Sequence, residues 1–284
     1  MKKYILISVF VASLAQNSFA ASSGTCGAYH AETNTYDCYW SLDDDNKLTI
    51  TGSGAMYDYD YPSSENPAPW GTNISEIDIS GITSIGRLAF NRATSSNAKI
   101  GSSVLSINAG AFQTMPNLQT VEFAENSNLT SIGVDVFGDT PKLEHIDLPN
   151  NLTYLGHYNF LNSGVKSLVL PDSLFQENAE GLNYSALTDI QQIFCSKQNE
   201  KKCEEYLKTA KAFTYKDGKW VYEPLTGVEI KTYEFDNGNY VCDGKFYNSL
   251  NDIGTANNIK KRIYTVNEAN KISGKKNRVT IRYK

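Results

Sequence analysis

The sequence has few of the residues on which catalytic and metal sites depend. Its three histidines, His30, His145 and His157, lie far apart, and it contains no Gly-x-Ser-x-Gly, no Cys-x-x-Cys and no Gly-x-x-x-x-Gly-Lys-[Ser/Thr] motif. Nucleophilic catalysis needs a base beside the nucleophile, structural zinc needs clustered Cys and His, and nucleotide phosphates need a glycine-rich loop. The sequence therefore predicts a protein without catalytic residues, a metal site or a cofactor.

Long apolar runs are also scarce. One run, Tyr4–Leu14, follows two lysines and precedes Ser18 and Ala20, small residues at the positions that signal peptidase prefers. The run is too short to span a membrane. We expect a cleaved signal peptide over residues 1–20 and a secreted or cell-surface protein without a transmembrane span in the mature chain.

Cysteines are few and odd in number, and export permits disulfides between them. Cys26 and Cys38 flank a segment that is typical of a hairpin, so we expect them to pair. Cys195 and Cys203 bracket a short polar link into a helical segment, and we expect a second disulfide there. Cys242 is then unpaired, and its surroundings favour a buried strand residue.

A short motif recurs along the middle of the chain, as TSIGRLAF, LSINAGAF, TSIGVDVF and TYLGHYNF. The successive units end at Phe90, Phe112, Phe137, Phe160 and Leu182, which are 22, 25, 23 and 22 residues apart. Five residues before each phenylalanine lies an aliphatic residue: Ile85, Ile107, Ile132 or Leu155. Such a period predicts a solenoid in which these residues are inward anchors and Gly86 permits a turn between two of them.

Each unit also contains a short alternating stretch: EIDIS, NAKIG, TVEFA, HIDLP or SLVLP. Alternation predicts half-buried strands, which stack in parallel in a solenoid. Their outward residues would form one surface, which we call the strand face: Glu76, Asp78, Lys99, Thr120, Glu122, His145 and Asp147, continued by Ser167 and Val169.

The strand face is the candidate ligand-binding site. Asp78, Glu122 and Asp147 would form a mostly acidic stripe that suits a basic or polar partner. Alternatively, these charges only keep the face soluble and block edge pairing. A second candidate is the tyrosine-rich loop Met56–Pro62, for which the alternative is packing against the N-terminal cap.

The motifs resemble those of bacterial BspA-like leucine-rich repeat proteins. The segment LTITGSGAMYDYDYPSSENPAPW precedes ITSIGRLAF, and LEHIDLPNNLTYLGHYNF carries the repeat itself. The resemblance covers about Cys26 to Cys195, with Asn108 in place of a glycine as one departure. It implies a secreted or surface-located protein that adheres to ligands on host or neighbouring cells.

These observations predict a β-rich α+β solenoid of leucine-rich repeats with parallel strands. After the signal peptide, we expect an N-terminal β-hairpin cap over 21–73, the solenoid with a C-terminal capping helix over 74–212, and a small β-meander module over 213–284. Asp-Gly and Asn-Gly pairs between Tyr- and Val-rich runs predict the hairpins of that module.

The C-terminal tail is strongly basic. Lys260–Lys284 contains nine Lys and Arg against one Glu, whereas the rest of the mature chain is acidic. The tail could bind an anionic cell-surface polymer, be read by a sorting machine, or simply be solvated. Nucleic acid is not an expected partner of an exported acidic chain.

Taken together, these features predict non-catalytic binding or adhesion to protein or glycan ligands. The alternatives are a structural envelope protein retained on its own cell and a carbohydrate-active accessory module.

Overall fold

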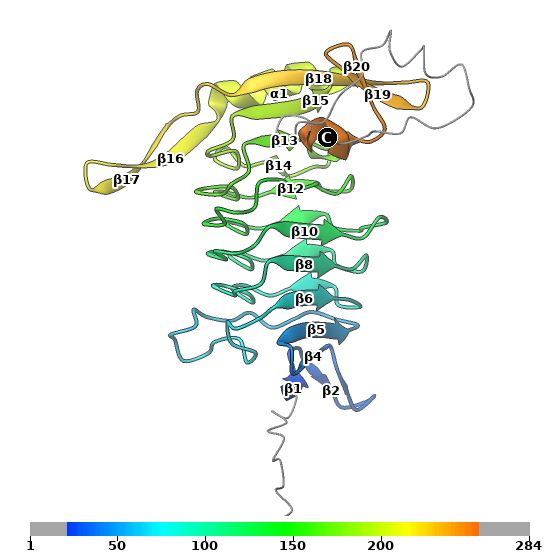
Figure 1. Ribbon diagram of the computed structural model, residues 1–284, viewed down its shortest axis with the longest axis vertical. Coiled ribbons are helices and arrows are strands. Elements are labelled where there is room, and N and C mark those ends of the chain that lie inside the picture. Colours follow the sequence, from blue (N-terminus) through cyan, green and yellow to red (C-terminus); the bar gives the residue numbers. More distant parts are fainter. Residues whose placement is uncertain (1–21, 256–284) are drawn as a thin grey trace, which may run out of the picture.

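The chain forms a column of stacked rungs (Figure 1). The structure, a computed structural model, describes residues 22–255. The expected signal peptide and the basic tail Lys260–Lys284 lie outside the described residues. Within the described range, no helix combines the length and hydropathy that crossing a membrane requires.

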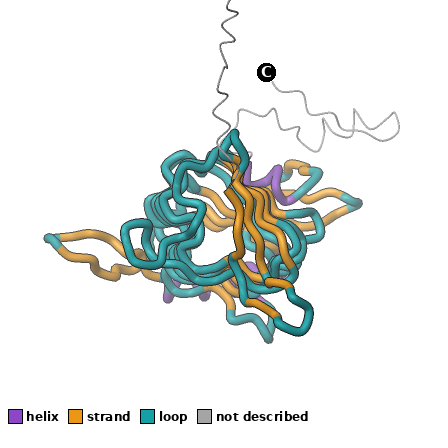
Figure 2. Tube along the Cα trace, turned by 90° about the horizontal axis from the view of Figure 1, so that it is seen from below, coloured by secondary structure: helices purple, strands orange, loops and turns teal. Residues whose placement is uncertain are grey.

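The rungs contribute strands to two parallel sheets, although not every rung has a strand in both, and loops close the remaining side of the column (Figure 2). The first sheet contains β5 (Lys47–Gly52), β6 (Glu76–Ile79), β8 (Asn97–Ile100) and β10 (Thr120–Phe123). The second contains β7 (Ser84–Ile85), β9 (Ser106–Ile107), β11 (Ser131–Ile132), β12 (Tyr154–Leu155) and β14 (Gly181–Leu182). The expected solenoid of parallel strands is confirmed.

A stack of aromatic rings fills the centre of the column. Its members are Trp70, Phe90, Phe112, Phe137 and Phe160, with successive ring centroids 5.7, 5.1, 5.8 and 6.4 Å apart. All five side chains are buried, and so are the aliphatic anchors of the second sheet. One rung alone could not bury such rings on both faces, so stacking is what stabilises each rung.

Gly86 is required for close approach rather than for turning the chain. Its φ is not positive, but a Cβ at this position would overlap the carbonyl oxygen of Tyr57. A Cβ on Gly156 would likewise overlap the carbonyl oxygen of Gly133 in the preceding rung. Glycine therefore lets the backbones of successive rungs pack together. The expectation that Gly86 is needed for a turn was wrong.

The last repeat has a different register from the one counted along the sequence. Leu182 pairs with Leu155 in the second sheet, so it corresponds to the isoleucine anchors. Leu187, five residues later and fully buried, takes the place of the phenylalanine. The assignment of Leu182 was wrong because the 3₁₀ turn η1 (Asp172–Phe175) lengthens this rung.

The N-terminal cap is an antiparallel sheet that merges into the solenoid. β1 (Ser22–Thr25) pairs with β4 (Cys38–Leu42), and β4 forms a hairpin with β5. The small hairpin of β2 (Tyr29–His30) and β3 (Thr35–Tyr36) lies between Cys26 and Cys38, which form the expected disulfide. β5 also pairs in parallel with β6, so the cap provides the first solenoid strand.

The C-terminal segment continues the solenoid sheet across the expected boundary at 212/213. A sheet runs in the order β13 (Ser167–Val169), β15 (Gln192–Ser196), β18 (Glu229–Asp236), β19 (Asn239–Cys242) and β20 (Lys245–Tyr247). The expected meander is present as β18–β20, but β18 runs parallel to β15. The meander is therefore part of the column and not a separate module.

Two helices and one hairpin complete the described chain. They are α1 (Glu200–Thr209), preceded by η2 (Lys197–Asn199), the hairpin β16 (Lys211–Lys216) and β17 (Lys219–Pro224), and α2 (Leu250–Thr255). The expected Cys195–Cys203 disulfide ties α1 to β15. Cys242 is free and buried, as expected, and burial raises the pKa of its thiol to about 11.

Candidate functional site

Outward side chains of β6, β8 and β10 lie in rows across the sheet. Asp78, Lys99 and Glu122 are paired in register, as are the inward residues beneath them. Neighbouring strands lie about 4.8 Å apart, so each charge in the row lies beside the next. The three strands thus bring together the residues that the sequence assigned to this part of the strand face.

The strand face is not a row of uncompensated carboxylates. Lys99 Nζ lies 3.0 Å from Glu76 Oε1, and Lys47 Nζ lies 3.7 Å from Glu76 and 3.6 Å from Asp78. The hydrogen bond from Lys99, aided by the charge of Lys47, lowers the pKa of Glu76, and the same bond raises the pKa of Lys99. The expectation of a mostly acidic stripe is therefore corrected: on the first strands of the strand face, positive and negative side chains alternate.

Lys47 is a site residue that the sequence reasoning missed. It belongs to β5, which was assigned to the cap, yet β5 is in register with β6. The alternation of Leu48 and Ile50 with polar residues in β5 was the signal that could have revealed it.

Next to the charged row, Thr120 Oγ1 donates a hydrogen bond to Asn97 Oδ1 at 2.6 Å. Asn97, Thr120 and Glu122 are all exposed. This part of the strand face therefore offers both hydrogen-bond donors and acceptors to a ligand.

His145 and Asp147 lie beyond β10 on a segment that is not a strand. The expected strand in HIDLP is absent from the described structure, but the alternation survives, because Ile146 packs in the core. Its burial orients the flanking side chains outward, although the backbone forms no ladder. His145 Nε2 lies 2.5 Å from Asp147 Oδ1.

The strand face ends at β13. Ser167 is only 5% exposed, and Val169 packs against the small cluster of Phe194, Tyr233, Cys242, Tyr247 and Ile253. In Figure 1, α2 lies beside β13, and Leu250 of α2 packs against the same cluster. The expectation that Ser167 and Val169 extend an open face was therefore wrong.

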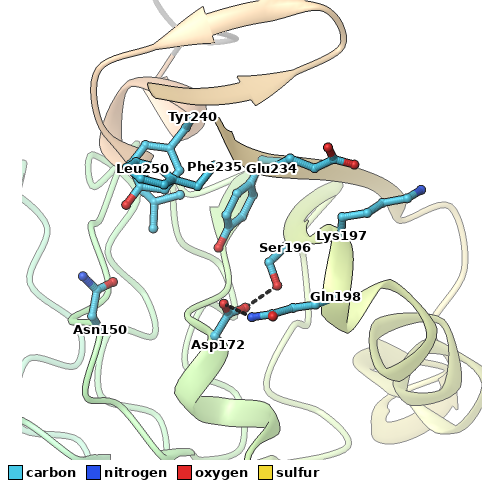
Figure 3. A pocket seen from close by; sticks show the side chains of 10 residues that line it. Asn150, Asp172, Ser196, Lys197, Gln198, Glu234, Phe235, Tyr240 and Leu250 are labelled. Atoms are coloured by element: carbon cyan, nitrogen blue, oxygen red, sulfur yellow. Dashed lines mark hydrogen bonds between the residues drawn. The ribbon is translucent and has the colours of Figure 1, made fainter. Parts of the chain in front are cut away.

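Two pockets lie where the C-terminal segment meets the end of the strand face. The face pocket has a volume of about 740 Å³ and lies between the turn after β10, the Asp147–Asn151 segment and α2. The meander pocket, of about 590 Å³, is drawn in Figure 3. Asn150, Tyr240 and Leu250 line both pockets. Asp147 thus belongs both to the strand face and to the face pocket.

In the meander pocket, Asp172 is held by several hydrogen bonds (Figure 3). Ser196 Oγ donates to Asp172 Oδ1, Gln198 Nε2 donates to Oδ2 at 2.7 Å, and Asn199 Nδ2 donates to Oδ1 at 2.8 Å. These bonds join η1 to β15 and η2, so this carboxylate has a structural role. Residues 22–255 contain no group of three or more His, Cys, Asp or Glu that could hold a metal ion.

The tyrosine-rich loop Met56–Pro62 is split between core and surface. Met56 and Tyr59 are buried, with the ring of Tyr59 5.3 Å from that of Trp70, whereas Tyr57 and Tyr61 are exposed. Asp60 pairs with Arg87 of the first repeat at 2.6 Å. The loop is thus fastened to the column, and it lies apart from the strand face.

The repeat region of the chain is similar to known proteins. Residues 69–188 match the family described as BspA type Leucine rich repeat region, in six copies. A solved leucine-rich repeat protein from Eubacterium ventriosum is 32% identical, over 63% of this chain and 45% of that chain, with a TM-score of 0.49. The match thus spans less than half of that protein's length. No curated protein matches the chain. Residues 69–188 therefore consist of BspA-type leucine-rich repeats.

Proposed function

We propose that this protein is exported and acts as a non-catalytic binding protein, which adheres through its strand face to protein or glycan ligands on host or neighbouring cells. The observation that carries the proposal is the in-register polar surface of β6, β8 and β10, which leads toward the face pocket. Repeat proteins use such extended surfaces for binding.

The charges of the face favour an extended polar ligand. Glu76 and Lys99 already pair with each other, so a ligand that displaced a single pair would gain little. A ligand that spans several rows can add hydrogen bonds to Asn97 and Thr120 and reach Asp147 at the face pocket. We therefore favour a ligand with several hydrogen-bonding groups and at least one basic group.

Export and surface location form part of the same proposal. They rest on the basic start, the apolar run and the small-residue exit of residues 1–20 and on the family resemblance. Binding of the tail Lys260–Lys284 to an anionic surface polymer would hold the protein on a cell.

The test is a ligand array with the mature chain and charge-reversed variants. Extracellular-matrix proteins and a glycan panel are screened first, and each bound ligand is titrated against the double variant Glu122→Lys, Asp147→Lys. We expect at least about a tenfold loss of affinity. The matched control, Glu177→Lys with Glu180→Lys, makes the same charge change at exposed positions outside the face and is expected to bind normally.

Three results would contradict the proposal. Equal binding by the strand-face variant and the control would remove the strand face as the site. Fractionation that finds all of the protein on the producing cell, with no ligand bound on the arrays, would favour a structural envelope protein. Hydrolysis of any glycan in the panel would indicate a carbohydrate-active module instead.

A further inference from the structure

The hairpin β16–β17 protrudes from the side of the column (Figures 1 and 2). Its register pairs Phe213 with Tyr222 and Tyr215 with Trp220, so one side of the hairpin is entirely aromatic over these two rows. The opposite side carries polar and charged residues, including Glu223, which pairs with Lys216 at 2.5 Å.

The base of the hairpin is fastened to the column, whereas its outer half is open. The ring of Phe213 lies 4.6 Å from that of Tyr158, and the ring of Tyr222 lies 5.4 Å from that of Tyr184. Further out, Trp220 is 47% exposed and Tyr215 is 63% exposed. Large exposed aromatic side chains on a two-stranded sheet are typical of a surface that binds another protein.

The edge of β17 carries the backbone groups that a further strand would need. The amides of Lys211 and Phe213 donate to Tyr184 O and Thr188 Oγ1, so they point away from β17. Their pairs with Pro224 and Tyr222 are therefore the non-hydrogen-bonded pairs of the hairpin.

Hydrogen-bonded and non-hydrogen-bonded pairs alternate along the rest of the hairpin. Both Trp220 and Tyr222 therefore direct their N–H and C=O groups outward from the free edge of β17. The described sheet contains only these two strands. Such an edge is a template for strand pairing, and its aromatic side chains lie directly beside it.

We propose that β17 pairs antiparallel with β17 of a second copy of this chain, about a two-fold axis at Val221. In this register Trp220 lies opposite Tyr222 of the second copy, and each of these pairs exchanges two hydrogen bonds. On the other side of the sheet, Lys219 lies opposite Glu223 of the second copy, and the reverse pair forms by symmetry.

Three registers of the two β17 strands would align their outward N–H and C=O groups. Charge complementarity and the missing N–H of Pro224 select the proposed register from these three. Shifting the pairing toward the turn places Trp220 opposite itself and Tyr222 opposite Gly218, outside the strand. Shifting it the other way places Trp220 opposite Pro224, which has no N–H. Neither shift brings Lys219 opposite Glu223, so one register alone satisfies both the hydrogen bonds and the charges.

Pairing would convert two hairpins into one four-stranded sheet. A two-stranded hairpin is only marginally stable by itself, and three or more strands give independent stability. Trp220 of each copy would then lie beside Tyr222 of the other on the same face of the sheet, as an aromatic cross-strand pair that stabilises the pairing.

Sedimentation equilibrium of the mature chain tests the proposal. We expect the average mass to rise from one chain to two with concentration. Lys219→Glu places like charges opposite each other at two sites, and we expect it to weaken the dimer by about tenfold. Glu223→Lys should do the same. An equimolar mixture of the two variants should associate again, because each supplies the charge that the other lacks.

The mixture also separates pairing from misfolding. Glu223→Lys removes an ion pair within the hairpin, but an unfolded variant could not restore association in the mixture. The control Lys201→Glu makes the same charge change on α1 at an exposed position and should dimerise like the unmodified chain. A chain that stays monomeric up to its solubility limit, or a mixture that fails to associate, would overturn the proposal.

Discussion

Replacing Phe112 with alanine tests whether the ring stack supports the column. Phe112 is fully buried, and its ring lies 5.1 Å from that of Phe90 and 5.8 Å from that of Phe137. The substitution removes the ring from the middle of the stack and leaves a cavity between two rungs. Both neighbours are themselves fixed by the rungs beyond them, so the cavity has little scope to collapse.

The expected loss of unfolding free energy is about 4–5 kcal/mol, the upper part of the range for phenylalanine truncation in a core. Phe160→Ala gives a useful comparison, because among the described residues Phe160 stacks on Phe137 alone, at 6.4 Å. One aromatic pair contributes about 1 kcal/mol beyond its area, so Phe160→Ala should cost about 1 kcal/mol less. Leu105 is 46% exposed, and Leu105→Ala should change stability by less than about 0.5 kcal/mol.

Urea unfolding followed by far-UV circular dichroism measures these losses. A loss of about 4 kcal/mol would remove a large fraction of a typical total stability of 5–15 kcal/mol and lower Tm by roughly 10 °C. If Phe112→Ala cost no more than Leu105→Ala, the ring stack would not be a source of stability. Equal losses at Phe112 and Phe160 would contradict the contribution of ring pairing.

Three further predictions concern single sites. Burial raises the pKa of the Asp135 carboxyl from 3.8 to about 7. The folded state therefore binds a proton that the unfolded state has lost, and stability falls as pH rises from about 4 to 7. In thermal melts, Asp135→Asn should remove this pH dependence and add about 2 kcal/mol of stability at pH 7, after allowance for partial exposure. Gly86→Ala should cost at least about 2 kcal/mol in urea unfolding, because the new methyl group overlaps the Tyr57 carbonyl, whereas Gly218→Ala meets no atom within 4 Å and should cost only about 1 kcal/mol for its positive φ. Replacing both Cys195 and Cys203 with serine removes a disulfide that closes a short loop and should cost about 2–3 kcal/mol, measured by thermal unfolding against the unmodified chain.

The repeated part of the fold was predictable because each rung carries the same local signals. Ile85 and Phe90 recur with their spacing, and alternation placed Glu76, Lys99 and Glu122 on one side of the strands. Two-residue turns were equally readable: Asp217-Gly218 connects β16 and β17 with both residues at positive φ. In each case the signal lies within a few residues of the structure that it specifies.

The features that the sequence did not reveal depend on distant contacts or on counting. A constant repeat length predicts Leu182 at the phenylalanine position, because no local sequence signal marks the extra turn η1. Val169 packs against a cluster that includes residues of α2, more than eighty residues later in the chain. The charge of the strand face depends on Lys47 reaching Glu76 from a strand outside the repeats.

The two ends of the column are closed by antiparallel strands, β1 with β4 at one end and β18 with β19 and β20 at the other. A column with such ends cannot be extended by adding repeats at either terminus of the parallel sheet. It can be extended only by duplicating an internal rung, of 22–25 residues in the regular part of the chain. Each duplication would add about 4.8 Å to the strand face and one more row of outward side chains, without altering the core contacts of either end. The length of the strand face is thus set by the number of rungs, which evolution or an engineer can change one rung at a time.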